Sequence, residues 1–116
     1  MQKIKLYNAH CCGEIGDVVT ELNLNYNSPK EGSIALFKDK TWRNFFLNEP
    51  RGGVFKHCNL IVKASNPNAD IGFIIMEPED NPPMSGSNSI CVSTVLLEKN
   101  LINMNYPTTT IHLEAP

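Results

Sequence analysis

The spacing of apolar residues predicts two strands in the first part of the chain. Over residues 3–9, Ile4 and Leu6 alternate with polar neighbours, as expected for a half-buried strand. Residues 18–24 alternate less regularly, and we expect them to pair with the first strand. The Asn-rich stretch 25–28, followed by Pro29, ends this second strand.

The period changes to that of a helix from Ser33 onward. Apolar side chains recur at helical spacing on one side, and charged side chains occupy the other. Ser33 is expected to cap the start of this helix, and Pro50 with the glycines at 52–53 to end it. A second apolar helix is predicted to follow residues 85–88 and to end near residues 99–100.

Two mostly apolar runs, 58–64 and 70–76, predict buried strands joined by a turn at residues 66–68. Residues 108–113 predict one more strand. The resulting order, β-β-α-β-β-α-β, indicates an α+β or mixed α/β fold whose helices pack against a largely antiparallel sheet. The whole chain, residues 1–116, is expected to form a single domain.

Charge and composition exclude several classes of partner. Ten Lys and Arg residues against 12 Asp and Glu residues give a net charge of −2, which disfavours nucleic acid and anionic membranes. No apolar run approaches the roughly 18–20 residues that span a bilayer, and the first residues do not form a secretory signal. We therefore expect a cytoplasmic protein that binds neither nucleic acid nor a membrane.

The four cysteines, Cys11, Cys12, Cys58 and Cys91, form no Cys-x-x-Cys pair and are expected to be free thiols. His10 and the two cysteines after it are consecutive, so on a strand they would point to opposite faces and could not converge on one ion. No metal site is predicted. Cys91 lies on an apolar stretch of the last predicted helix and is expected to pack in the protein core.

The most suggestive local feature is the start of the last helix. Free backbone N–H groups and the positive end of the helix dipole favour an anion there. Gly86 allows a ligand to approach closely, and Ser87 or Asn88 can cap the helix or donate hydrogen bonds. A carboxylate suits such a site, whereas the absence of a P-loop lysine disfavours a nucleotide phosphate. The same residues also fit an ordinary helix cap, so the pattern alone leaves both interpretations open.

A second cluster occupies residues 8–14 (Asn-Ala-His-Cys-Cys-Gly-Glu), after the first predicted strand. His10, the two thiols and Glu14 could form a nucleophilic site. A lone histidine beside cysteines is also common as a structural or surface residue, so this pattern alone does not decide between the two.

Four motifs occur in order along the chain. They are residues 8–14, residues 49–52 (Glu-Pro-Arg-Gly), residues 69–76 (Ala-Asp-Ile-Gly-Phe-Ile-Ile-Met) and residues 84–90 (Met-Ser-Gly-Ser-Asn-Ser-Ile). Together they resemble the N-terminal part of the proline racemase family, which includes hydroxyproline epimerases and dehydratases. The resemblance implies one half of a diaminopimelate epimerase-like, pseudo-symmetric two-domain fold.

The departures from the family pattern concern the site. Ser85 stands where the family has its first catalytic cysteine, and Gly86, Ser87 and Asn88 replace its carboxylate-binding Gly-His-Gly. The serine followed by Gly-Ser-Asn is similar to the branch associated with hydroxyproline 2-epimerases. Asn8 replaces the family's aspartate and Cys11 its threonine.

The resemblance implies a racemase or epimerase of proline or hydroxyproline that uses two bases and no cofactor or metal. Ser85 would be one base, and the N–H groups of Gly86, Ser87 and Asn88 would hold the substrate carboxylate. A serine hydroxyl is a weak base and needs assistance, for which His10 is a candidate relay and Glu14 a candidate supporting residue.

In the family, the second catalytic cysteine lies in a second half that this sequence does not contain. We therefore expect a truncated N-terminal portion that does not racemise by itself. Two alternatives remain open: a 3-hydroxyproline dehydratase or epimerase of the same family, and a non-catalytic half-domain that binds a carboxylate or pairs with another chain. An exposed edge at residues 108–113 would favour such pairing, including a homodimer.

Overall fold

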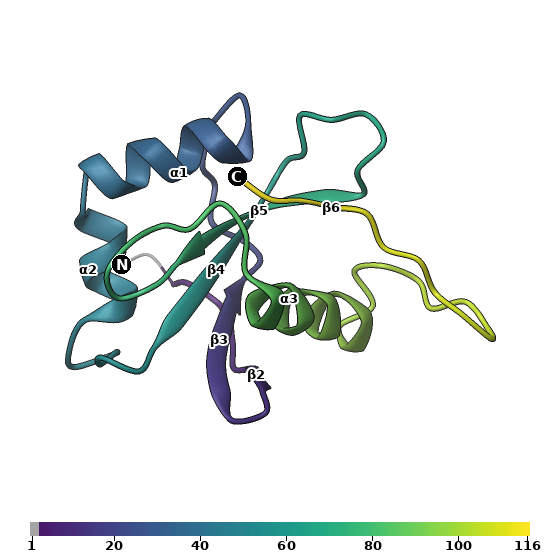
Figure 1. Cartoon of the computed structure of the whole chain (residues 1–116), viewed down its shortest axis with the longest axis horizontal. Helices are drawn as coiled ribbons and strands as arrows, with labels where there is room; N and C mark the ends of the chain where they lie inside the picture. The colour runs from purple at the N-terminus through teal and green to yellow at the C-terminus, as the bar shows by residue number, and fades with distance from the viewer. Residues whose placement is uncertain (1–2) are drawn as a thin grey trace.

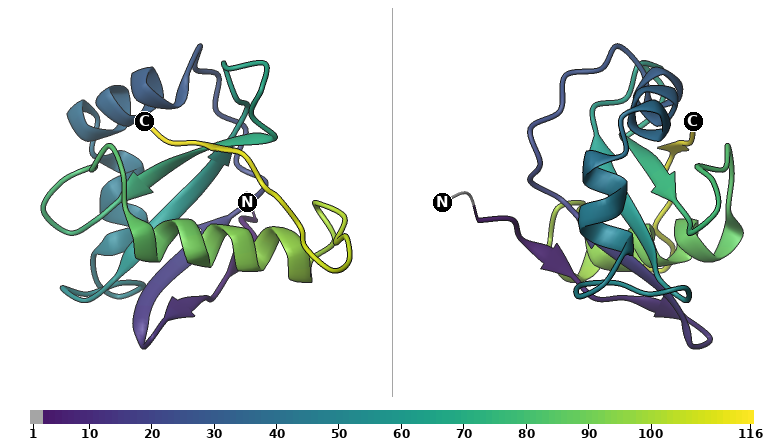
Figure 2. Two further views of the ribbon diagram at one scale, coloured as in Figure 1. Left: turned by 45° about the vertical axis from the view of Figure 1, so that its right-hand side comes forward. Right: turned by 90° about the vertical axis from the view of Figure 1, so that its left-hand side faces the viewer.

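The computed structural model describes residues 3–116 and has three layers, with one sheet between two helical layers (Figure 1). Helices α1 and α2 cover one face of the sheet, and α3 covers the other (Figure 2). No helix in this range is long and apolar enough to cross a membrane. The elements are β1 (Leu6–Tyr7), β2 (His10–Cys11), β3 (Glu14–Val19), α1 (Pro29–Lys38), α2 (Thr41–Leu47), β4 (His57–Val62), β5 (Ile71–Met76), α3 (Gly86–Glu98) and β6 (Leu113–Glu114).

The sheet is mixed, with strand order β1-β3-β4-β5-β6 and β2 paired to β3 outside this path. The pairs β1–β3, β2–β3 and β4–β5 are antiparallel, whereas β3–β4 and β5–β6 are parallel. Strand β3 runs parallel to β4 because α1 and α2 lie between them in the sequence and carry the chain back across the sheet. The expected mixed α/β class is confirmed, but the sheet is less antiparallel than we predicted.

Both faces of the central strands are buried, which explains their nearly continuous apolar sequences. Successive residues alternate between the two helical layers, so that Val19 faces α1 and α2 while Val18 faces α3. The same alternation continues in β5, where Ile74 and Phe73 lie on opposite faces. The two cores therefore share one set of strands, and a shift of one residue in register would exchange them.

The helix predicted from Ser33 onward is two helices. Helix α1 begins earlier, because Ser28 caps it by accepting the N–H of Glu31 at 3.1 Å and Pro29 occupies its first turn. Ser33 is buried inside α1 and does not cap it. The break falls at Asp39, whose carboxylate accepts hydrogen bonds from the backbone N–H and the hydroxyl of Thr41. These bonds lower the pKa of Asp39.

The β4–β5 hairpin was predicted correctly, and the ends of its strands differ from the expected ones by at most two residues. The second strand, expected over residues 18–24, is instead β3, and its antiparallel pairing with the first strand is confirmed. The last strand was expected over residues 108–113, but only the two residues of β6 pair with β5. Before β6, the hydroxyl of Thr109 bonds both the N–H and the carbonyl of Asn105, so this segment forms a local turn.

Gly16 sets how closely α3 approaches the sheet. A Cβ atom at this position of β3 would lie 2.8 Å from Oδ1 of Asn88 and 2.9 Å from Sγ of Cys91. Both contacts are shorter than van der Waals distance, so only glycine allows the first turns of α3 to rest on β3.

We predict that Gly16→Ala destabilises the chain by about 1–3 kcal/mol, because its methyl group overpacks the contact between β3 and α3. Urea unfolding followed by circular dichroism measures the change. Gly86→Ala is the matched control, since a Cβ atom at Gly86 meets nothing within 4 Å and the control should be at least as stable as the wild type. Equal stability of the Gly16 variant and the wild type would contradict this account of the packing.

Candidate functional site

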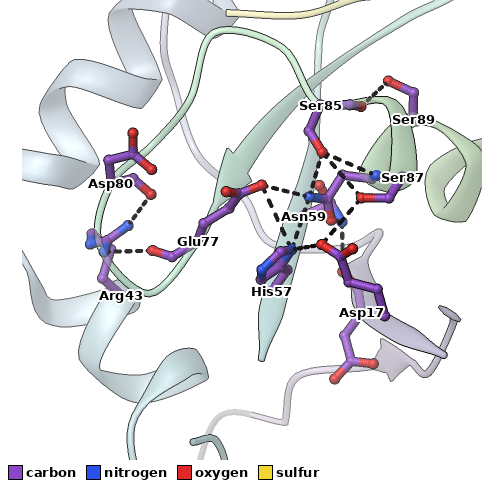
Figure 3. A network of polar contacts seen from close by, with 11 residues as sticks. Asp17, Arg43, His57, Asn59, Glu77, Asp80, Ser85, Ser87 and Ser89 are labelled. Atoms are coloured by element: carbon purple, nitrogen blue, oxygen red, sulfur yellow. Dashed lines mark hydrogen bonds and ion pairs between the residues drawn. The ribbon is translucent and has the colours of Figure 1, made fainter. Parts of the chain in front are cut away.

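Ser85 lies at the start of α3, where it is the N-cap residue (Figure 3). Its backbone is extended, with φ −150° and ψ 122°, and its Oγ accepts the N–H of Asn88 at 3.3 Å. The same Oγ also accepts the side-chain Nδ2 of Asn88 at 3.0 Å. Two donors and the positive end of the helix dipole therefore surround one hydroxyl oxygen, an arrangement that stabilises negative charge on it.

Asn88 is buried and is oriented by a second buried asparagine. Nδ2 of Asn59, on β4, donates to Oδ1 of Asn88 at 2.8 Å and to the backbone carbonyl of Asp17 at 3.3 Å. Both asparagine side chains are almost fully buried. Because Oδ1 of Asn88 faces a donor, its Nδ2 must point toward Ser85.

His57 and Glu77 surround the same amide. Nδ2 of Asn88 is 3.1 Å from Oε2 of Glu77 and 3.3 Å from Nδ1 of His57. An amide nitrogen has two hydrogens, so Ser85, Glu77 and His57 compete for them. Nδ1 of His57 also lies 3.3 Å from Oε1 of Glu14 and 3.6 Å from Oε2 of Glu77. The imidazole thus stands between two carboxylates.

Ser87 links α3 to this acidic group. Its hydroxyl lies 3.4 Å from Oγ of Ser85 and 3.4 Å from Oε1 of Glu14. Three strands and one helix therefore deliver polar groups to one place: Glu14 begins β3, His57 begins β4, Glu77 follows β5, and Ser85 caps α3. Figure 3 shows the labelled members of this group converging beside the first turn of α3.

A buried arginine holds the loop that leads from β5 to Ser85. Arg43 of α2 donates to the backbone carbonyls of Glu77 at 2.8 Å, Pro78 at 3.2 Å and Asp80 at 3.1 Å, and also to Oδ1 of Asn81. Burial lowers the pKa of its guanidinium, and the nearby Asp80 partly opposes this effect. These bonds fix the backbone of residues 77–80, which begins with Glu77 and leads along the chain to Ser85.

A charged pair lies behind the site. Oδ2 of the buried Asp17 forms an ion pair with Nζ of Lys56 at 2.8 Å. Oδ1 of Asp17 accepts the amide of Asn8 at 3.1 Å. Asn8 therefore orients a carboxylate in this structure. The pair neutralises the charge beneath Asn59 and leaves the polar cluster at Ser85 without a buried unpaired ion.

Among the residues expected from the sequence, Ser85, Ser87, Asn88 and Glu14 come together, and Gly86 lies exposed at the first position of α3. The N–H of Asn88 is occupied by Oγ of Ser85, so the N–H groups of Gly86 and Ser87 are the ones left for a carboxylate. These roles remain predictions.

His10, the candidate relay residue for Ser85, lies in the turn between β2 and β3. Its Nδ1 accepts the N–H of Gly13 at 3.1 Å and closes the β2–β3 turn, in which Cys12 and Gly13 have positive φ. Within residues 3–116, no hydrogen bond joins His10 to Ser85.

His57, Glu77 and Asn59 were missed by sequence reasoning. Each lies within or beside a strand whose apolar pattern was recognised, and nothing in that pattern marked them as polar residues facing Ser85. The available signal was a polar residue inside an otherwise apolar strand, which describes Asn59.

The cysteines are free, as expected. Burial raises the pKa of the Cys58 and Cys91 thiols, and Cys91 faces Gly16 inside the core. Neither thiol is poised to act as a base. In the described part of the chain, no group of three His, Cys, Asp or Glu side chains could hold a metal ion.

Comparison with known proteins identifies the family. The proline racemase family model matches residues 6–116, which is nearly the whole chain. The chain belongs to the proline racemase family. Two solved structures of similar proteins each match 97% of this chain with a TM-score of 0.89. One is a hydroxyproline epimerase from Agrobacterium vitis with bound trans-4-hydroxy-L-proline, at 37% identity. The other is a probable proline racemase from Agrobacterium radiobacter K84 with bound carbonate, at 39% identity.

The chain spans 34% of the epimerase and 35% of the probable racemase. The fold expected from the motifs, that of the proline racemases, is confirmed over this length. The site around Ser85 therefore lies in a chain that corresponds to about one third of the length of these two proteins.

We predict that Asn59→Ala lowers the free energy of unfolding by about 1–3 kcal/mol, because it leaves the buried Oδ1 of Asn88 without a donor. Asn48→Ala is the matched control: it also removes an asparagine–asparagine bond, that from Asn48 to Asn44 at 3.1 Å, but an exposed one, and should cost less than about 0.5 kcal/mol. Urea unfolding of both variants gives the comparison. Equal losses of unfolding free energy in the two variants would show that burial of the Asn59–Asn88 hydrogen bond adds nothing to stability.

Proposed function

We propose that this chain carries one half of the active site of a cofactor-independent racemase or epimerase of proline or hydroxyproline, with hydroxyproline favoured. The observation that carries the proposal is the position of Ser85, whose Oγ caps α3 and accepts two hydrogen bonds from Asn88. The bound trans-4-hydroxy-L-proline of the A. vitis epimerase supports the choice of substrate.

In the proposed reaction, Ser85 Oγ removes the α-proton from one face of the amino acid. The hydrogen bonds from Asn88 stabilise the negative charge that this oxygen acquires as its own hydroxyl proton leaves. The substrate carboxylate lies on the N–H groups of Gly86 and Ser87, where the helix dipole also stabilises the enolate-like charge of the deprotonated substrate. A second base outside residues 1–116 then returns a proton to the opposite face.

The proposal includes a small-molecule substrate, no nucleic-acid or membrane partner, and a location in the cytoplasm. The net charge of −2 and the four free thiols support these points. A homodimer through the edge of the sheet near β6 remains part of the proposal, since β6 is short and pairs on one side with β5.

We predict that Ser85→Ala, made in the complete protein that contains this chain, lowers α-proton exchange by about 10²-fold or more, because it removes one of the two bases. Exchange is measured by proton NMR in D₂O with L-proline and trans-4-hydroxy-L-proline, and the epimers are separated by chiral chromatography. Ser93→Ala, in the same helix and away from the cluster, is the control. Unchanged exchange with both enantiomers would remove Ser85 from the mechanism.

We also predict that the 116-residue chain alone produces no epimer, because the proposed reaction needs two bases and assigns only Ser85 to this chain. Chiral chromatography after long incubation tests this, together with calorimetric titration of pyrrole-2-carboxylate, a planar analogue. Binding without turnover would favour the carboxylate-binding alternative for the isolated chain. Epimerisation by the purified chain would disprove the need for a second base elsewhere.

A further inference from the structure

A serine base poses a problem of proton balance. When Ser85 Oγ accepts the substrate's α-proton, its own hydroxyl proton must leave, since a neutral hydroxyl does not hold both. Asn88 contacts Oγ with its N–H and its Nδ2, and both groups are donors that cannot take a proton. The proton therefore has to leave Ser85 by another route.

One route is present beside Ser85. Oγ of Ser85 lies 3.4 Å from Oγ of Ser87, which lies 3.4 Å from Oε1 of Glu14, and that oxygen lies 3.3 Å from Nδ1 of His57. A hydroxyl both accepts and donates, so Ser87 can pass a proton in either direction. The path ends on a half-exposed carboxylate, which can receive a proton and exchange it with solvent.

We propose that Ser87 and Glu14 form the proton relay of Ser85, and that His57 positions Glu14. The inference rests on the proposed function of Ser85 as a base. As the substrate Cα–H bond breaks, Nδ2 of Asn88 releases Ser85 Oγ and keeps its contact with Glu77, which frees one lone pair of the hydroxyl oxygen. The substrate proton bonds to this lone pair, and the C–H electron pair stays on the substrate. The original Ser85 proton moves to Ser87 Oγ, and the Ser87 proton moves to Glu14, which becomes a neutral carboxylic acid. Reversing these transfers protonates the substrate.

Glu77 is not an equivalent end point. Its Oε2 reaches Ser85 only through Nδ2 of Asn88, at 3.1 Å from that nitrogen, and an amide nitrogen does not relay a proton. Glu77 instead helps to orient Asn88. His10 is engaged with the N–H of Gly13 in the β2–β3 turn.

The two hydroxyl contacts of the relay are longer than the usual 2.7–2.8 Å of an O–H···O bond. Each must shorten by about 0.6 Å for transfer, and rotation of the Ser87 and Glu14 side chains can supply this, since Glu14 is half exposed. His57 limits how far Glu14 can turn, because its ring is 15% exposed and fixed beside Asn88. In this relay, the carboxylate of Glu14 and the hydroxyl of Ser87 act through Ser85 and do not contact the substrate.

The first test needs no turnover. In the 116-residue chain, the NMR signals of Ser85 and Ser87 should shift with pH along the same curve as the carboxyl carbon of Glu14. The other groups that face the cluster are His57 and Glu77, with Asp17 and Lys56 behind it. The shared shift should therefore vanish in Glu14→Gln and persist in Glu77→Gln. If the Ser85 and Ser87 signals do not change over the pH range in which the Glu14 carboxyl signal changes, the relay is wrong, whatever the activity of the protein.

The second test uses the complete protein. Glu14→Gln and Ser87→Ala should each lower kcat by about 10²-fold with little change in KM, because each interrupts proton transfer and leaves the backbone N–H groups in place. The double variant should lose no more than either single variant, since both residues belong to one serial path. Ser87→Thr retains the hydroxyl and should recover most of the loss.

Glu21→Gln is the matched control, because Glu21 is 66% exposed and its 4.0 Å contact with Lys5 lies outside the cluster. All variants should unfold at the wild-type urea midpoint. The relay would be wrong if the double variant lost kcat by the product of the two single-variant factors. It would also be wrong if the variants raised KM at constant kcat. Absence of exchange in the wild-type protein would instead disprove the proposed function, and the NMR titration would still decide whether the path exists.

Discussion

The hydrogen bond between Asn59 and Asn88 is the contact on which the rest of the site depends. At 2.8 Å and out of contact with solvent, it fixes which end of the Asn88 amide points at Ser85. The bond forms only because Gly16 lets the first turns of α3 rest against β3. Gly16 on β3, Asn59 on β4 and Asn88 on α3 therefore act together to orient the Asn88 amide toward the hydroxyl of Ser85.

The sequence predicted the parts of the fold that depend on apolar periodicity. The β4–β5 hairpin and α3 lie close to their expected ranges, because long runs of buried residues leave few alternatives. The break at Asp39 and the shortness of β6 were missed, since each depends on local hydrogen bonds, to Thr41 in the first case and within residues 105–109 in the second. Such bonds leave no periodic trace in the sequence.

The site divides in a similar way. Ser85, Gly86, Ser87 and Asn88 were predicted as site residues because they are contiguous and stand at the position of a family motif, and Glu14 was predicted through a second motif. His57 and Glu77 were not, because they reach the site only through the pairing of β3, β4 and β5. The parallel step between β3 and β4 pairs Gly16 with His57, and no local pattern of residues foretells that contact.

Burial explains why the polar residues of the site have the identities they have. The innermost groups, Asn59 and Asn88, are neutral amides, which cost much less to bury than charged groups do. The ionisable groups lie farther out: the side chains of His57, Glu77 and Glu14 are 15%, 26% and 52% exposed. A carboxylate in the position of Asn88 would be buried beside the carboxylate of Glu77, and the two would repel each other. The hydroxyl of Ser85 is thus held by the neutral amide of Asn88, while the ionisable groups lie at the rim, where solvent reaches them.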